Sequence, residues 1–284
     1  MTSLLNAKKA FAIFREGDCR FIDCRFSFDD PSWGKKVYGE GHIPGAVYLD
    51  MEKDLSGEPK NHGGRHPLPD MGTFLETIRA FGIREDLPVI CYDQGGAPFA
   101  ARLWWMMKYI GHDRVYILNG GIPEWLKADY PVDKKMPEFA PTTYLPNIRR
   151  DMVAEVEEVR ETVEGTRKAV LIDSRESARF LGEREPIDRV AGRIPGAVNR
   201  FWLEGFHNGT FLSAEKQKIR FRGLNPEQEL IVYCGSGVTA CPNVLSLYEA
   251  GFRNVKLYVG SFSDWISYPE HPIEKGKSGK GGTL

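Results

Sequence analysis

Cys234 has the clearest chemical potential in this sequence, because it stands between an apolar run and a glycine-rich turn. It opens the segment CGSGVT at 234–239, which leads directly into a helical pattern. Two glycines let the backbone curl so that successive N–H groups point into one hollow. The start of a helix adds partial positive charge. A cysteine placed there is expected to exist largely as thiolate, its nucleophilic form. The alternative is a buried strand-end cysteine followed by a glycine turn.

Three chemistries use a cysteine in such a loop. A phosphatase of the C-x5-R type needs an arginine six positions after the cysteine, and Ala240 occupies that position, which argues against it. A thiol protease needs a histidine base, which the sequence alone does not place beside Cys234. Transfer of a sulfur atom needs only a thiolate and a hollow that stabilises a bound persulfide. The loop supplies that minimum.

An internal repeat organises the elements that must position this loop. Four segments recur in the same order at a nearly constant offset: FIDCR (21–25) and LIDSR (171–175), HIPGAV (42–47) and RIPGAV (193–198), PVICYDQGGAPFAARL (88–103) and ELIVYCGSGVTACPNVL (229–245), GHDRVYILNGGIPEW (111–125) and GFRNVKLYVGSFSDW (251–265). We infer a duplication, with an N-terminal domain at 1–130, a proline-containing linker at 131–150, a C-terminal domain at 151–275 and a flexible tail at 276–284.

Each copy alternates short apolar runs with helical patterns. The runs are rich in β-branched and aromatic side chains and predict strands at 21–25, 88–92, 115–118, 169–173, 230–233 and 255–259. Apolar residues at three- and four-residue spacing predict helices over 97–111 and 238–251, each ended by a glycine. Strand–helix–strand units of this size form parallel sheets, whose ligands bind beyond the carboxyl ends of the strands. The Cys234 loop is therefore expected at such an edge.

Composition excludes several other classes of protein. The 284 residues suggest two domains, at roughly 150 residues each. The 38 Lys and Arg against 39 Asp and Glu leave a net charge of −1, which is not typical of a nucleic-acid binder. No apolar stretch is long enough for a membrane span, and the charged N-terminus is unlike a signal peptide. Five cysteines are too few for a disulfide scaffold, so we expect a cytoplasmic protein with free thiols and no membrane partner.

With these motifs together, the chain resembles the two-domain rhodanese-type sulfurtransferases over about residues 5–270. The resemblance rests on five segments: HIPGA at 42–46, IPGA at 194–197, DSR at 173–175, WW at 104–105 and CGSGVTA at 234–240. It implies an α/β fold of two tandem rhodanese-like domains, each a parallel sheet flanked by helices. It also implies that the C-terminal copy carries the active cysteine, Cys234, and that the N-terminal copy, where Asp93 aligns with it, is inactive.

The family uses two kinds of sulfur donor. Its thiosulfate enzymes typically carry basic residues in the loop, whereas the uncharged loop here is similar to that of 3-mercaptopyruvate sulfurtransferases. The latter bind the donor with two arginines, of which the first corresponds to Arg179. Ile187 stands where the second is expected, and Arg184, Arg189 and Arg193 remain candidates to replace it. Mercaptopyruvate is therefore the expected donor, with thiosulfate as the alternative and a non-catalytic persulfide carrier as a third reading.

The implied cycle has two steps on Cys234. Its thiolate takes the outer sulfur of the donor as a persulfide, and an acceptor such as cyanide, a small thiol or thioredoxin then removes it. No metal or organic cofactor is needed. The backbone N–H groups of Gly235, Gly237, Val238 and Thr239 are expected to cradle the anionic persulfide, as an oxyanion hole does for oxygen.

The resemblance further implies a relay of a carboxylate, a histidine and the loop serine, Ser236. The matching positions are Glu52, with Asp50 as the nearby alternative, and His66. The other interpretation of the HGGRHPLP stretch around His66 is a polar surface loop. Arg175, which follows the strand-end aspartate by two positions, is expected to pair with a carboxylate and to be structural.

Overall fold

The computed structural model describes residues 2–96 and 98–277. The chain divides into two compact units, one of Met1–Gly57, Leu68–Arg149 and His207–Phe211 and one of Glu58–Pro67, Arg150–Phe206 and Leu212–Leu284. The short segment Glu58–Pro67 thus belongs to the second unit, although the first unit flanks it in the sequence. The domain boundaries inferred from the repeat stay a prediction, and residues 278–284 of the expected tail lie outside the described residues.

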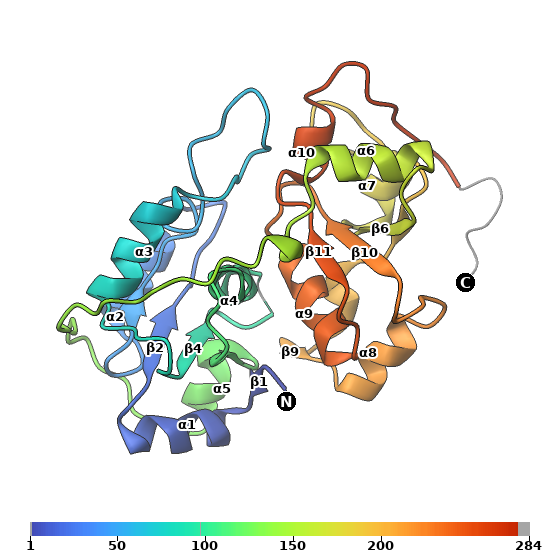
Figure 1. Cartoon of the computed structure of the whole chain (residues 1–284). Helices are drawn as coiled ribbons and strands as arrows, with labels where there is room; N and C mark the ends of the chain where they lie inside the picture. Colours follow the sequence, from blue (N-terminus) through green and yellow to red (C-terminus); the bar gives the residue numbers. More distant parts are fainter. Residues whose placement is uncertain (1, 97, 278–284) are drawn as a thin grey trace. The chain divides into compact units, whose positions relative to one another are not determined.

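The first unit is built on a parallel sheet with the strand order β1-β5-β4-β2-β3 (Figure 1). Its strands are β1 (Leu4–Leu5), β2 (Arg20–Asp23), β3 (Val47–Tyr48), β4 (Val89–Tyr92) and β5 (Val115–Leu118). Its helices are α1 (Ala7–Glu16), α2 (Trp33–Glu40), α3 (Met71–Ala80), α4 (Phe99–Tyr109) and α5 (Gly121–Lys127). Aromatic contacts of Phe14 and Phe21 with the buried Trp125 hold α1 and α5 against one face of this sheet.

The second unit repeats this plan with the parallel order β11-β10-β6-β7. The strands are β6 (Ala169–Asp173), β7 (Val198–Asn199), β10 (Glu229–Tyr233) and β11 (Val255–Leu257). The helices are α6 (Val156–Glu164), α7 (Ser177–Leu181), α8 (Ala214–Arg220), α9 (Cys241–Glu249) and α10 (Ser261–Trp265). Helices α6, α7 and α10 lie on one face of the sheet and α8 and α9 on the other (Figure 1). The short elements of this unit are η1 (Arg150–Met152) and η2 (Trp202–Gly205). Strand β8 (Phe206–His207) begins at the last residue before the segment His207–Phe211 of the first unit, and that segment contains its partner strand β9 (Thr210–Phe211).

Matching positions of the repeat make the same contacts in each unit. A buried ion pair of 2.6 Å joins the aspartate that ends one strand to the arginine two positions on, Asp23–Arg25 and Asp173–Arg175. In each sheet, the neighbouring strand (β4 or β10) ends in a tyrosine whose hydroxyl accepts a 3.3 Å hydrogen bond from the isoleucine N–H of an Ile-Pro-Gly segment. Tyr92 accepts from Ile43, and Tyr233 accepts from Ile194. The tandem α/β fold predicted from the repeat is confirmed, and Arg175 pairs with a carboxylate as expected.

The structure differs from the sequence prediction at the start of one helix. Helix α9 begins at Cys241, three residues later than the predicted range 238–251, because residues 234–240 form a loop instead of the first helical turn. The strand before that loop, β10, has consecutive side chains buried from Leu230 to Tyr233, as in a parallel strand covered on both faces. The loop therefore follows the carboxyl end of a buried central strand.

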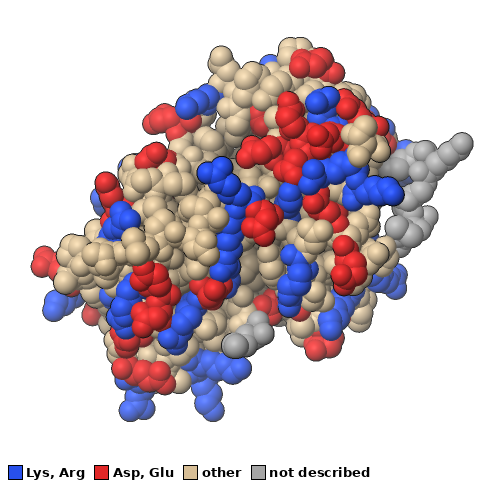
Figure 2. Space-filling view, viewed as in Figure 1, with Lys and Arg blue, Asp and Glu red and all other residues tan. Residues whose placement is uncertain are grey.

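Charges of both signs are interspersed on the face drawn in Figure 2, which agrees with the balanced composition. Among the residues that the structure describes, no helix is both long and apolar enough to cross a membrane.

Candidate active site

Cys234 follows the last residue of β10 and is held by the chain at the start of α10. Its N–H donates to Oγ of Ser261 at 3.1 Å, and its carbonyl accepts from the N–H of Phe262 at 3.0 Å. The thiol side chain is buried, with Oγ of Ser261 4.0 Å from Sγ. These contacts fix the direction in which the Cys234 side chain leaves the backbone.

The N–H of Gly237 donates to Sγ of Cys234 at 3.1 Å, which closes the loop around the sulfur. This geometry requires glycine, since Gly237 has φ +80° and an added Cβ would lie 2.2 Å from the carbonyl oxygen of Val259. After it, the Val238 carbonyl accepts from the N–H of Cys241 at 3.1 Å as the chain enters α9. A backbone donor is thus aimed at the buried sulfur of the candidate nucleophile.

Ser236 lies in the same loop and meets His66. Oγ of Ser236 is 2.8 Å from Nδ1 of His66, although 170 residues separate the two positions in the sequence. Thr239 is partly exposed at the end of the loop. The structure thus brings together two of the three side chains expected in the relay.

His66 reaches the loop because the segment 58–67 is fastened to the region of α10. The N–H of Gly63 donates to Asp264 at 2.7 Å, and the N–H of Arg65 donates to Oγ of Ser263 at 3.1 Å. Gly64 has φ +81°, and an added Cβ there would lie 2.3 Å from the carbonyl oxygen of Gly260. The close approach of these two backbones explains the glycine and sets the position of both Arg65 and His66.

Arg179, the predicted clamp for the donor, projects from α7 into a cluster of charged side chains beside the loop. Its Nε donates to Glu185 at 2.9 Å and its Nη2 to Asp188 at 2.7 Å. Asp188 also forms an ion pair with Arg65. An added Cβ on Gly235 would lie 3.0 Å from Nη2 of Arg65 and 3.3 Å from Nη2 of Arg179. Both guanidinium groups therefore lie directly against the residue that follows Cys234.

The two carboxylates of this cluster titrate differently. Burial raises the pKa of Glu185, but hydrogen bonds from Arg179 and from the N–H groups of Asp188 and Ile187 outweigh burial and hold it below its usual value. For Asp188, burial dominates and raises the pKa above its usual value, against the opposing charges of Arg65 and Arg179. Glu185 is thus a firm anchor for Arg179, whereas the charge on Asp188 is more costly to keep.

The structure gives the remaining candidates other contacts. Glu52 is exposed in the first unit, where its N–H donates to the Asp50 carboxylate at 2.9 Å, and its place in a relay stays a prediction. Arg184 is exposed, and Arg189 donates to the carbonyl of Ile266. Arg193 is buried, where it pairs with Glu274 and donates to the carbonyls of Phe180 and Gly276.

Sequence reasoning did not single out Arg65, Asp188 or Ser261. Arg65 and Asp188 are 123 positions apart, so no local pattern connects them. Nothing in the sequence around Ser261 indicates its role. In the structure it is a non-glycine residue at φ +56°, and its hydroxyl donates to the carbonyl of Tyr258 at 2.9 Å. Strained backbone of this kind clusters at functional sites.

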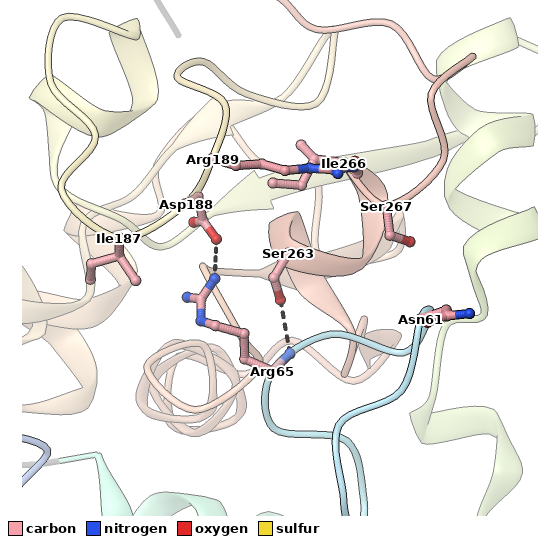
Figure 3. Close-up of a pocket in the computed structure, with 8 residues that line it drawn as sticks. All are labelled: Asn61, Arg65, Ile187, Asp188, Arg189, Ser263, Ile266 and Ser267. Carbon is pink, nitrogen blue, oxygen red and sulfur yellow. Dashed lines mark hydrogen bonds and ion pairs between the residues drawn. The ribbon is translucent and has the colours of Figure 1, made fainter.

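A cavity of about 330 Å³ adjoins the charged cluster (Figure 3). It is lined by Asn61, Arg65, Ile187, Asp188, Arg189, Ser263, Ile266 and Ser267. In Figure 3 the Arg65 side chain extends from the segment 58–67 to the Asp188 carboxylate. Arg65 thus belongs both to the wall of this cavity and to the surroundings of Gly235.

The corresponding loop of the first unit holds a carboxylate in place of a thiol. Asp93 follows β4 and accepts from the N–H groups of Gly95 at 2.9 Å and Ala100 at 3.1 Å. Burial raises the pKa of this carboxyl to about 7, although these N–H groups oppose the shift. The loop of the first unit therefore keeps backbone donors but offers no nucleophilic sulfur.

Comparison with known proteins decides the family. The Rhodanese-like domain matches residues 6–128 and 155–268. The chain belongs to the rhodanese family. Its fold also matches the rhodanese fold of SseA from Escherichia coli, described as a 3-mercaptopyruvate sulfotransferase, with a TM-score of 0.81 and 32% identity over 93% of this chain and 100% of that one.

Relatives within the rhodanese family bear two names. A probable 3-mercaptopyruvate sulfurtransferase of Pseudomonas aeruginosa is 40% identical over 280 residues, 96% of this chain and 98% of that protein. A thiosulfate sulfurtransferase of Rattus norvegicus is 33% identical over 273 residues, 92% of this chain and 90% of that protein. Both names describe transferases of sulfur groups, so the enzyme class expected from the sequence is confirmed at the level of the family, while the donor is not decided.

Proposed function

We propose that this rhodanese transfers a sulfur atom from 3-mercaptopyruvate to a thiol or cyanide through a persulfide on Cys234. The observation that carries the proposal is the hydrogen bond of 3.1 Å from the N–H of Gly237 to Sγ of Cys234, in a loop without charged side chains. A nucleophilic sulfur needs stabilisation as thiolate before the attack and as persulfide after it. The same N–H serves both states.

In the first step, the Cys234 thiolate attacks the sulfur of 3-mercaptopyruvate and forms an S–S bond. The bond between that sulfur and the methylene carbon breaks, its electron pair stays on carbon, and pyruvate enolate leaves. The proton of the donor thiol ends on the methyl group of pyruvate, so the enzyme keeps an anionic persulfide. In the second step, an acceptor thiolate or cyanide attacks the outer sulfur and releases the Cys234 thiolate.

The proton transfer is assigned to Ser236 and His66. Their hydrogen bond of 2.8 Å, beside the loop that carries the nucleophile, supports a path from the donor thiol through the serine hydroxyl to the imidazole and back to the enolate. Glu52 is kept as the proposed third member of this relay. Arg179 is proposed to bind the carboxylate of the donor, because its guanidinium lies against Gly235.

Thiosulfate is the second candidate donor, and one observation favours it. Two guanidinium groups, those of Arg65 and Arg179, lie beside Gly235, and paired cations suit a compact dianion. In this reaction the Cys234 thiolate takes the outer sulfur of thiosulfate and sulfite leaves with the electron pair. A protein that only carries persulfide between partners needs neither cation.

The test is the specificity constant kcat/KM with each donor, on the native protein and on Cys234→Ala. We expect mercaptopyruvate to be preferred by tenfold or more, about 1.4 kcal/mol of transition-state binding, and Cys234→Ala to be inactive with both donors. If thiosulfate is preferred, the proposed donor is wrong, while the proposed nucleophile, Cys234, stands. Full activity of Cys234→Ala contradicts the proposal.

A further inference from the structure

We propose that Arg65 is the second cation of the donor site, which with Arg179 holds the anionic group of the sulfur donor beside Gly235. This inference rests on the proposed function, because it concerns the donor that Cys234 attacks. It places the second positive charge on the segment 58–67 rather than on the chain around Ile187, where the family resemblance locates it.

Position is the first argument. Nη2 of Arg65 would lie 3.0 Å from a Cβ on Gly235, and Nη2 and Nη1 of Arg179 would lie 3.3 and 3.6 Å from it. Two guanidinium groups from segments far apart in the sequence thus converge on the residue next to the nucleophile. An anion held by both has its reactive end directed to the loop of Cys234.

The second argument is that the Arg65 side chain starts from a fixed backbone. Its N–H donates to Oγ of Ser263 at 3.1 Å, and the neighbouring Gly64 lies in backbone contact with Gly260. Ser263 in turn donates its N–H to the carbonyl of Gly235 at 2.9 Å. Arg65 is therefore tied to Gly235 through one intermediate residue, and the backbone that carries its guanidinium need not be ordered when an anion binds.

The third argument is that the two arginines already bind a carboxylate together. Asp188 bridges the two guanidinium groups, with one oxygen on Arg65 and the other 2.7 Å from Nη2 of Arg179. The Asp188 side chain is 1% exposed, against 12% for Arg179 and 35% for Arg65. Each guanidinium offers five donor hydrogens in a planar fork, so a second anion can bind on the more open side of the pair.

The fourth argument concerns the other arginines. Arg193 is buried against Glu274, and Arg189 donates to the carbonyl of Ile266. Neither supplies one of the three atoms nearest to a Cβ on Gly235, which all belong to Arg65 and Arg179. Ile187, at the position expected for the second arginine, is 61% exposed and lines the cavity next to Arg65 (Figure 3). A short side chain at 187 leaves the space beside Arg65 open to the donor.

The test compares Arg65→Met with Arg179→Met and with the matched control Arg222→Met, which removes an exposed positive charge from the same unit. We expect KM for the preferred donor to rise about 10- to 100-fold in each of the first two variants, the range of a charge-assisted hydrogen bond, with a smaller change in kcat. Arg222→Met is expected to match the native protein. Thermal unfolding of each variant checks that the second unit remains folded.

Arg65→Met could raise KM indirectly, by leaving the Asp188 carboxylate without its partner. The double variant Arg65→Met with Asp188→Asn distinguishes this indirect effect from direct binding of the donor by Arg65. If Arg65 binds the donor itself, the double variant stays impaired. If the defect of Arg65→Met came only from an uncompensated carboxylate that repels the donor, the neutral Asn restores the native KM and overturns the inference.

A binding measurement separates this inference from the proposed function. In the Cys234→Ala background the donor binds without reacting, so calorimetry with 3-mercaptopyruvate and with thiosulfate gives Kd directly. A rise of about tenfold or more in Kd on adding Arg65→Met, for the donor that binds, supports the inference. Unchanged Kd and KM in Arg65→Met, with both raised in Arg179→Met, overturn it while leaving the Cys234 persulfide untouched.

Discussion

Replacement of Gly237 by alanine tests the loop that surrounds the sulfur. Gly237 has φ +80°, and the new methyl group would be placed 2.2 Å from the carbonyl oxygen of Val259. The backbone conformation costs about 1–2 kcal/mol for a residue with a side chain. The steric conflict adds about 1–3 kcal/mol, as for an overpacked core. We therefore expect Gly237→Ala to lower the free energy of unfolding by about 2–5 kcal/mol.

The same substitution displaces the N–H that donates to Sγ of Cys234 at 3.1 Å. Loss of a hydrogen bond to a charged group costs about 1.5–3 kcal/mol, which lowers kcat about 10- to 150-fold. Because the N–H contacts the nucleophile and not the donor, KM is expected to change much less. Urea unfolding measures the free energy of unfolding, and steady-state kinetics with 3-mercaptopyruvate measures kcat and KM.

Gly196→Ala is the matched control. Gly196 also lies in the second unit with φ +76°, but an added Cβ there meets nothing within 4 Å. Gly196→Ala carries the same cost of placing a side chain at positive φ, but it meets no steric conflict. The two variants are therefore expected to differ by about 1–3 kcal/mol in unfolding free energy. If they agree within about 0.5 kcal/mol, or if Gly237→Ala keeps the native kcat, the role given to this N–H is refuted.

Two further predictions concern His66 and Asp93. His66→Gln keeps a hydrogen-bonding partner for Ser236 but carries no titrating proton, so kcat is expected to fall about 100-fold and to lose one limb of its pH profile; an unaltered profile contradicts the relay. Asp93 has a folded-state pKa of about 7, above the unfolded value of 3.8, so its contribution to stability is full below about pH 4 and is lost as the pH rises through 7. Relative to the native protein, Asp93→Asn is therefore expected to gain up to about 4 kcal/mol between about pH 4 and pH 8 in urea unfolding, and no pH-dependent gain would show that the carboxyl is not held as described.

The sequence predicts the framework well where a local pattern is strong. The apolar runs that became β6 and β10 have consecutive buried residues, and Gly237 marks a turn whose conformation only glycine adopts easily. Strands β1, β3 and β7 have only two residues each, too few to show a period. The sequence places the start of α9 too early because Val238 continues the three-residue apolar spacing of Cys241 and Val244, whereas residues 234–240 form the loop.

The candidate site is predicted less completely, because several of its contacts join distant segments. Arg65 reaches Asp188 across 123 positions and His66 reaches Ser236 across 170, so spacing carries no sign of either contact. The family resemblance predicts His66 but not Arg65, since it places the second arginine near Ile187. What brings Arg65 to the site is the backbone contact between Gly64 and Gly260, a tertiary feature.

The most direct test of the account is to identify the sulfur-bearing atom in a single turnover. The native protein is mixed with donor in the absence of acceptor, and its peptides are analysed by mass spectrometry. Cys234 and Cys241 lie on one tryptic peptide, between Arg222 and Arg253, so fragmentation of that peptide must separate them. The account predicts the added mass of one sulfur atom on Cys234, which cyanide removes as thiocyanate. Sulfur on Cys241, or turnover without any added sulfur on Cys234, would contradict it.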